Sequence, residues 1–304
     1  MKHNYTVTIA LIALFVLAQI FGLFLLSIDA DISVNEETGE RDVQFGDTAI
    51  GDRPETTSIG VLVFLFIGVL IGTLLLLYLA RTNRVNIWKA WFFLASWIAI
   101  ALALNVFVEL SIFAWLLALI ITSARIYYPN IFTQNIAELL MYAGIAVFLI
   151  PMLDVAVMVV VLILISLYDM YAVWKSKHMV KMAKFTAESD LFPGLSLKYN
   201  RKTNKPTKSS NEIKMSKKTR KASTGILGGG DIVFPLLFTG TVMLSLINQG
   251  VEEFIALQQA LIITITSALA LGTLLFLGQK QKFYPAMPFL SIGCFIGWGI
   301  VLLL

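Results

Sequence analysis

The chain has 304 residues, of which 58% are hydrophobic and 14% are charged, and its mean hydropathy is +0.82. Soluble globular domains contain about 45–50% apolar and about 25% charged residues, so this composition excludes a cytosolic enzyme, a secreted disulfide scaffold and a disordered chain. The single cysteine, Cys294, cannot form an intrachain disulfide. The formal net charge of +4 comes mainly from one loop. It is therefore used first to predict the membrane topology and only then to predict binding partners. The composition predicts a polytopic membrane protein.

Nine apolar segments are long enough, or nearly so, to cross about 30 Å of hydrocarbon, which takes roughly 20 residues of helix. Because backbone groups in lipid must find partners within their own segment, helices are expected and the predicted fold class is all-α. The first segment is expected to be a retained helix and not a signal peptide, because its apolar stretch exceeds the usual h-region. The nine predicted transmembrane helices cover residues 6–28, 59–80, 88–108, 111–125, 132–150, 153–174, 225–247, 252–277 and 283–304.

The loop between the first and second segments is acidic. Residues 29–58 contain nine acidic and two basic residues, net −7, interrupted by glycine and proline. Such a composition predicts a solvated hairpin or coil on the outer side of the membrane. A calcium-binding or substrate-gating role is the alternative, although no EF-hand spacing is present.

The loop after the sixth segment is basic. Residues 175–221 contain 14 basic and three acidic residues, net +11, which predicts attraction to anionic lipid head groups. Nucleic-acid binding is not expected, because no aromatic or zinc module accompanies the charge. This loop divides the chain into a predicted N-terminal membrane half at 1–174, a basic cytoplasmic loop at 175–224 and a C-terminal membrane half at 225–304.

The basic residues also predict the orientation of the chain. With nine helices and a cytoplasmic N-terminus, 21 of the 23 lysines and arginines lie on the cytoplasmic side, and only Arg41 and Arg53 lie outside. The predicted topology is therefore N-in and C-out, with multi-pass insertion in the cell membrane.

Ionisable residues deep in a transmembrane segment are the first candidates for function, because keeping them in lipid is costly. Most of the 19 acidic residues lie in the two loops or near segment ends, as Glu138 does at the start of the fifth segment. Asp169 and Asp231 are the exceptions, and no basic residue lies deep in a segment to neutralise them. Asp169 precedes Lys175 by six residues, about 9 Å along a helix, and Asp231 follows Lys221 by ten. Both carboxyl groups are therefore expected at the same depth on neighbouring helices.

Two carboxyl groups that lie close together in a low dielectric cannot both ionise, so one keeps its proton while the other serves as a base. The ionised carboxylate can deprotonate a water that attacks a scissile carbonyl, while the protonated carboxyl polarises that carbonyl and assists the leaving amine. No metal or other cofactor is needed, and His3 and His178 both lie outside the predicted segments. A proton relay or cation site in a transporter or channel is the alternative role for these two acids.

Glycines and prolines accompany the candidate site. Glycine weakens a helix and lets another backbone approach, or simply allows close helix packing. Three glycines directly precede Asp231, namely Gly228, Gly229 and Gly230. Prolines near a helix start leave backbone groups free, or simply kink the helix entry. The last segment opens with Lys282, followed after two residues by Pro285, Ala286, Met287 and Pro288.

Three motifs in these segments resemble those of presenilins and signal peptide peptidases, the GxGD intramembrane aspartyl proteases. The resemblance covers the sixth to ninth segments closely, and the order and spacing of the motifs fit. Met287 stands where the family has leucine, a nearly volume-conserving difference. The family's YD, GxGD and PAL motifs are matched by Tyr168-Asp169, Gly228-x-Gly230-Asp231 and Pro285-Ala286-Met287.

The resemblance implies a presenilin-like fold and hydrolysis of peptide bonds within transmembrane helices, with Asp169 and Asp231 as the catalytic pair. The N-in orientation and the short loops favour a compact archaeal homologue of the presenilin branch. The implied partners are transmembrane-helix substrates and the lipid bilayer, and the chain could act alone, as a homo-oligomer or with accessory subunits. The residues expected to support the site or hold an unwound substrate are Tyr168, Gly228, Gly229, Gly230, Lys282, Pro285, Ala286 and Met287.

Overall fold

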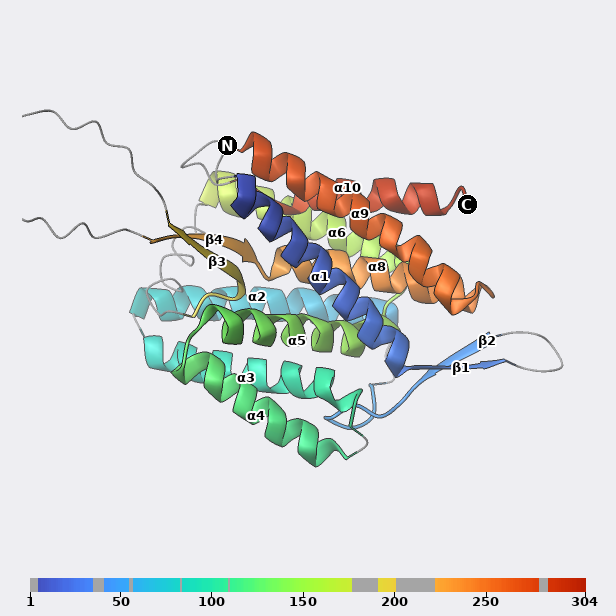
Figure 1. Cartoon of the computed structure of the whole chain (residues 1–304), viewed down its shortest axis with the longest axis horizontal. Helices are drawn as coiled ribbons and strands as arrows, with labels where there is room; N and C mark the ends of the chain where they lie inside the picture. The colour runs from blue at the N-terminus through green and yellow to red at the C-terminus, as the bar shows by residue number, and fades with distance from the viewer. Residues whose placement is uncertain are drawn as a thin grey trace, which may run out of the picture.

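The computed structural model of this chain describes residues 5–34, 41–54, 57–82, 84–108, 110–176, 191–200, 222–278 and 284–304. Most of these residues form α-helices that lie side by side and run back and forth between two ends of a bundle (Figure 1). The helices are α1 (Tyr5–Asp29), α2 (Ser58–Thr82), α3 (Val85–Asn105), α4 (Ser111–Tyr127), α5 (Ile131–Leu149), α6 (Val155–Tyr171), α8 (Gly230–Asn248), α9 (Glu253–Leu277) and α10 (Met287–Val301). A 3-10 turn (Ile150–Met152) follows α5, and a π-helical turn (Ala172–Ser176) follows α6.

Four short strands form two antiparallel hairpins, one at each end of the bundle (Figure 1). We call these ends the β1–β2 end and the β3–β4 end. The first hairpin agrees with the hairpin or coil predicted for the acidic loop, whereas the second was not predicted. The all-α class is therefore corrected to a mostly helical protein with two hairpins. The strands are β1 (Ala30–Val34), β2 (Arg41–Phe45), β3 (Gly194–Asn200) and β4 (Ala222–Gly228).

The β3–β4 hairpin has a strand pattern that the surrounding charge obscures. In β3, Leu195 and Leu197 alternate with polar residues, which is the period of two expected for a strand with one buried face. Leu195 pairs directly with Leu227 of β4, and both side chains are buried. A cross-strand apolar pair of this kind stabilises a short hairpin.

The helices follow the predicted segments to within three residues, except that the seventh and the ninth begin later than predicted, the ninth at Met287 instead of residue 283. Among the described residues, seven helices are long and apolar enough to span a membrane, namely α1, α2, α3, α5, α6, α8 and α9, while α4 and α10 are shorter. The number that crosses the bilayer therefore stays a prediction. The seventh segment, predicted from residue 225, becomes helical only at Gly230, because residues 222–228 form β4. Glycines 228–230 disfavour extension of the helix toward its N-terminus, and pairing with β3 satisfies the backbone instead.

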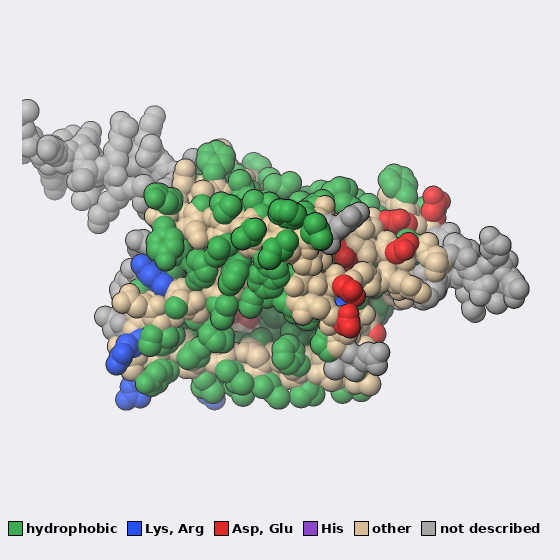
Figure 2. All heavy atoms as spheres, turned by 90° about the horizontal axis from the view of Figure 1, so that it is seen from below, with side chains coloured by type: hydrophobic (Ala, Val, Ile, Leu, Met, Phe, Trp, Pro, Cys, Tyr) green, Lys and Arg blue, Asp and Glu red, His purple; other side chains and the backbone are tan. Residues whose placement is uncertain are grey.

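Apolar side chains cover the middle of the face seen in Figure 2, with Lys and Arg gathered at one end and Asp and Glu at the other. The exterior of α2 is typical, because only Val61 and Leu79 of its 25 residues are buried. An apolar surface of this extent is expected where lipid is the solvent. The separation of charge agrees with the prediction that basic and acidic residues lie on opposite sides, while the side that faces the cytoplasm stays a prediction.

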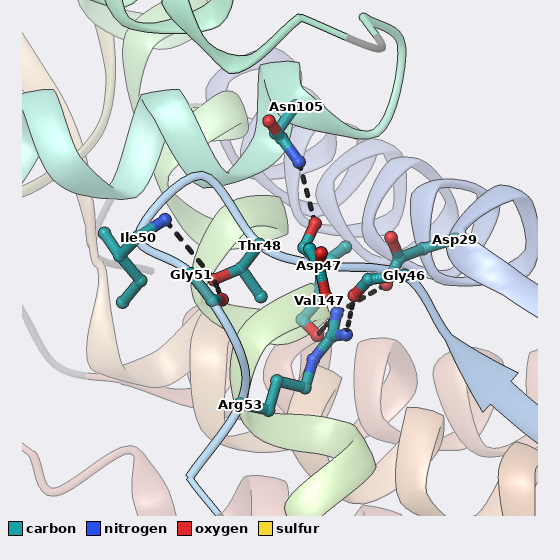
Figure 3. Close-up of polar contacts among 9 residues, drawn as sticks. All are labelled: Asp29, Gly46, Asp47, Thr48, Ile50, Gly51, Arg53, Asn105 and Val147. Carbon is teal, nitrogen blue, oxygen red and sulfur yellow. Dashed lines mark hydrogen bonds and ion pairs between the residues drawn. The ribbon is translucent and has the colours of Figure 1, made fainter.

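The acidic loop is anchored to the bundle after β2 (Figure 3). Arg53 forms an ion pair with Asp29 at 2.6 Å and donates to the Val147 carbonyl at 3.4 Å. That carbonyl lies four residues before Pro151, which has no N–H to donate to it. Two more side chains donate to loop carbonyls: Asn105 to Asp47 at 3.0 Å and Trp115 to Ala49 at 2.9 Å. The loop is thereby tied to α1, α3, α4 and α5.

The helices that carry the candidate residues pack against one another. α10 packs along α9 and also contacts α6 and α8, while α6 and α8 contact each other. The contact of α10 with α9 is close, because a Cβ on Gly297 would overlap the side chain of Thr266. Residues near the β3–β4 ends of α6, α8 and α10 are consequently brought into one region.

Candidate active site

A cavity of about 330 Å³ lies at the β3–β4 end, bounded by α2, α6, α8, the β3–β4 hairpin and the start of α10. Asp169 and Asp231 both line it, although 62 residues separate them along the chain. The remaining walls are mainly apolar or glycine, so the two carboxyl groups are the acidic groups of this cavity among the described residues. The lining residues are Val69, Leu76, Ile165, Tyr168, Asp169, Phe192, Pro193, Gly228, Gly229, Gly230, Asp231, Phe234 and Met287.

Asp169 occupies the last turn of α6 and is only 5% exposed. The Met287 backbone N–H donates to its Oδ2 at 3.1 Å, and the Ala286 backbone lies beside the same carboxyl. Met287 is the first residue of α10, where N–H groups have no partner within the helix. The positive end of the helix dipole also favours a carboxylate there. Asp169 thus caps α10. Through this contact, the backbone of the 285–287 motif holds the Asp169 carboxyl in place.

A second polar contact holds α6 against α10 one turn away from Asp169. Ser166 and Ser291 share a hydrogen bond of 2.8 Å between their hydroxyl groups, and Ser291 also reaches the Leu162 carbonyl at 3.4 Å. Hydrogen bonds between helices are a common means of fixing their relative position in a membrane. The Asp169 contact is therefore supported by its neighbours along the same interface.

Asp231 is the second residue of α8, and its side chain is partly exposed. Gly228 allows the carboxyl to fold back over the preceding turn, since a Cβ on Gly228 would lie 3.2 Å from Asp231 Oδ2. An acidic residue in a first helical turn is stabilised by the helix dipole, as Asp169 is at α10. Each candidate aspartate is thus associated with the N-terminus of a helix.

The first turns of α8 are loosened by a proline and supported by another helix. Pro235 lies within α8 and has no N–H for the Asp231 carbonyl, four residues earlier. Gln19 of α1, which is fully buried, donates from Nε2 to the Ile232 carbonyl at 2.9 Å. The backbone around Asp231 is consequently held by a side chain from a distant part of the sequence.

Comparison with known protein families identifies the family of this chain. Residues 12–304, nearly the whole chain, match the family described as signal-peptide peptidase, presenilin aspartyl protease. The chain belongs to this family of aspartyl proteases. The match extends over the first five segments, where the sequence motifs had given no specific resemblance.

Two solved structures share the fold of this member of the presenilin and signal-peptide peptidase family. Both are of a presenilin family intramembrane aspartate protease, one in the C222 and one in the P2 space group. Their TM-scores are 0.59 and 0.61, at 16% and 17% sequence identity. The alignments cover 96% and 97% of this chain and 95% and 96% of the respective solved chain. No curated protein matches the chain in sequence.

The other candidate residues of this presenilin family member are distributed as follows. Tyr168 lines the cavity, and its hydroxyl donates to Thr73 of α2 at 3.3 Å, which links α6 to the most exposed helix. Gly229 and Gly230 line the cavity, whereas Pro285 and Ala286 lie beside it at the entry to α10. Lys282 lies outside the described residues.

Sequence reasoning missed the hairpin as a wall of the cavity. Phe192 and Pro193, just before β3, line the cavity, and the Gly229 N–H donates to the Pro193 carbonyl at 3.2 Å. Two side chains of α5 bind the hairpin: Gln134 donates to the Gly194 carbonyl at 3.1 Å, and Asn135 exchanges two 3.0 Å hydrogen bonds with the Ser196 backbone. The apolar alternation in β3 was the available signal.

The sequence also gave no indication of a buried ion pair close to this wall. Arg125 of α4 pairs with Glu138 of α5, although both were assigned to segment ends. Neither side chain faces water, with exposed fractions of 2% and 0%. From the sequence, Asp169 and Asp231 were the only acidic residues predicted to lie deep in the bundle. That prediction was wrong for Glu138, which is also buried.

Proposed function

We propose that this member of the presenilin and signal-peptide peptidase family hydrolyses peptide bonds within transmembrane helices, with Asp169 and Asp231 as its catalytic pair. The observation that carries the proposal is that both carboxyl groups line one otherwise apolar cavity. Such a pair shares a proton, so that one member is a base while the other is an acid.

The reaction proceeds by acid–base catalysis without a covalent intermediate. The ionised aspartate takes a proton from a water molecule, whose oxygen bonds to the carbonyl carbon of the substrate, while the protonated aspartate gives its proton to the carbonyl oxygen. The resulting tetrahedral intermediate collapses as its nitrogen gains a proton from one aspartate, the C–N bond breaks and one hydroxyl returns its proton to the other aspartate. The products are a new carboxyl and a new amino terminus.

The site is suited to a peptide that has left its helix. A peptide bond inside an α-helix is shielded, and unwinding exposes N–H and C=O groups that need partners in an apolar setting. Backbone N–H and C=O groups that could pair with such a peptide lie close to the two aspartates. They belong to the turn at 228–230 and to the entry to α10 at Pro285, Ala286 and Met287. These residues, with Lys282, are proposed to hold the substrate, which reaches the site from the surrounding lipid bilayer of the cell membrane.

The test is cleavage of a labelled single-span peptide by the purified protein in liposomes, with products mapped by mass spectrometry. Asp169→Asn and Asp231→Asn should each abolish cleavage while leaving the melting temperature close to that of the wild type, because each removes one member of the acid–base pair. Substantial cleavage by either variant would contradict the proposal. Cation or proton flux that needs both aspartates, without cleavage, would instead favour the channel or transporter alternative.

A further inference from the structure

Three buried polar side chains connect α4 and α5 to the wall of the cavity. Arg125 pairs with Glu138, whose other carboxyl oxygen accepts a 2.5 Å hydrogen bond from the Tyr142 hydroxyl. Tyr142 is 3% exposed, so all three side chains are shielded from water. The Arg125 guanidinium also lies 4.8 Å from the centre of the Phe92 ring. The network is thus also packed against an aromatic ring of α3.

Both ends of this network reach residues that line the cavity. At one end, Arg125 Nη2 donates to the Phe192 carbonyl at 3.2 Å. At the other end, the Tyr142 ring packs against Gly229, where a Cβ would lie 2.9 Å from the Tyr142 hydroxyl and 3.1 Å from Cε1. Phe192 and Gly229 both belong to the cavity wall. The network therefore fixes two separate points of that wall.

The position of Gly229 determines the position of Asp231. The Gly229 carbonyl accepts hydrogen bonds from the N–H groups of Ile232 and Val233, at 3.1 and 2.9 Å. These two bonds close the first turn of α8, and that turn carries Asp231. A displacement of Gly229 would consequently move the backbone to which the Asp231 carboxyl is attached.

Stability alone does not account for a buried ion pair at this place. Removing two charges from water is costly, and exchange of such a pair for apolar residues of similar volume is often neutral or stabilising. We propose that Arg125, Glu138 and Tyr142 are positioning residues, which hold Gly229 and the Phe192 edge so that the Asp231 carboxyl is placed for reaction. The kinetic part of this proposal rests on the proposed proteolysis, and the structural part does not.

Tyr142→Phe is the mildest test, because it keeps the ring and removes the hydrogen bond to Glu138. We expect kcat for the single-span substrate to fall about 10-fold with KM unchanged, since misplacement of a catalytic group acts on the chemical step. Ser267→Ala is the matched control, because it removes an equally buried hydroxyl from α9, which lines no part of the cavity. An unchanged kcat in Tyr142→Phe, or an equal fall in the control, would overturn the proposal.

The contact between Tyr142 and Gly229 is tested by a double-mutant cycle. Gly229→Ala should reduce kcat by more than 10-fold, because the new methyl group meets the Tyr142 hydroxyl and displaces the turn. In a Tyr142→Leu background both the hydroxyl and the ring edge that the new methyl group would meet are absent, so Gly229→Ala should cost clearly less than it does alone. Losses that multiply independently would show that the two residues do not act on one another and would contradict the proposal.

Hydrogen exchange of the 227–234 backbone tests positioning without any assay of cleavage. Arg125→Met/Glu138→Leu removes the charges without leaving one unpaired, so the protein should fold. We expect exchange of this segment to be faster than in the wild type and in Ser267→Ala, and kcat to fall. Wild-type exchange and kcat in the folded double variant would overturn the proposal. Failure of the wild type to cleave any substrate would overturn the proposed function, while the exchange measurement would still decide on positioning.

Discussion

The described residues contain two arginine–carboxylate pairs, one at each end of the bundle, and they are built alike. At the β1–β2 end, Arg53 pairs with Asp29 and donates to the Val147 carbonyl. At the β3–β4 end, Arg125 pairs with Glu138 and donates to the Phe192 carbonyl. The two pairs differ in burial. The side chains of the first are each 12% exposed, and those of the second are 2% and 0% exposed.

This difference in burial separates two uses of the same interaction. Water reaches part of Arg53 and Asp29, so it can partly replace either partner, and such a pair contributes less to stability than a fully enclosed pair loses when it is broken. Water cannot replace Glu138, because Arg125 is enclosed between α4, α5 and the Phe92 ring. The first pair fastens a loop to the bundle, whereas the second lies against the wall of the proposed active site. Substitutions within the two pairs test this contrast.

Removal of one buried partner should have the largest effect. Glu138→Ala leaves the Arg125 charge buried without its carboxylate and also deprives the Tyr142 hydroxyl of its acceptor. We expect a loss of about 3–5 kcal/mol in the free energy of unfolding, as for other broken buried pairs. Thermal unfolding in detergent measures it, with Asp29→Ala as the matched change at the β1–β2 end. Equal losses for the two variants would abolish the distinction between the pairs.

An intermediate effect, on activity more than on stability, is expected at Pro285. Alanine at this position supplies an N–H and lets α10 extend by a turn toward its N-terminus. The Met287 N–H would then donate to a carbonyl within the helix instead of to Asp169. A hydrogen bond to a charged group contributes about 1.5–3 kcal/mol, so cleavage should fall about 10- to 100-fold. Pro288→Ala should act more weakly because it lies within the helix.

The Pro285 prediction is measured as cleavage rate against melting temperature, for both proline variants in one detergent. The melting temperature should fall only modestly, because Pro285 is buried but lies outside the helix, at the entry to α10. If Pro285→Ala cleaves like the wild type, or loses activity only in proportion to unfolding, the entry to α10 has no part in holding Asp169 or the substrate.

The sequence predicted the two aspartates because a charge deep in an apolar segment stands out without any knowledge of its neighbours. Arg125 and Glu138 did not stand out, since each lies within a few residues of a charged or polar corner. Only the antiparallel packing of α4 against α5 reveals that both are enclosed. Their burial depends on tertiary contacts, which hydropathy along the chain does not record.

The β3–β4 hairpin was missed for a related reason. Lys198 and the basic residues around it led to the interpretation of 175–221 as a basic loop attracted to lipid head groups, although Leu195 and Leu197 alternate as in a strand. Gln134 and Asn135 of α5 supply the hydrogen bonds that hold β3 in place. The helix boundary at Gly230 follows from the same hairpin, because β4 includes residues 225–228, which had been predicted to belong to the helix.

The smallest effect is expected for Arg53→Ala, at the β1–β2 end. The substitution removes the Asp29 ion pair and the bond to the Val147 carbonyl, which Pro151 leaves without a helical partner. Because water can reach both groups at this exposure, we expect a loss of at most about 1 kcal/mol in the free energy of unfolding. Cleavage should not change, since this loop lies at the opposite end of the bundle from Asp169 and Asp231.

Arg53→Lys sharpens the same measurement. Lysine keeps the charge near Asp29 but lacks the planar fork that lets arginine bond several acceptors at once. If the carbonyl contacts matter, Arg53→Lys should be as destabilised as Arg53→Ala; if the charge alone matters, it should match the wild type. A loss of several kcal/mol in either variant, or a fall in cleavage without unfolding, would show that this end of the bundle acts on the active site as the β3–β4 end is proposed to do, and the contrast between the two pairs would no longer hold.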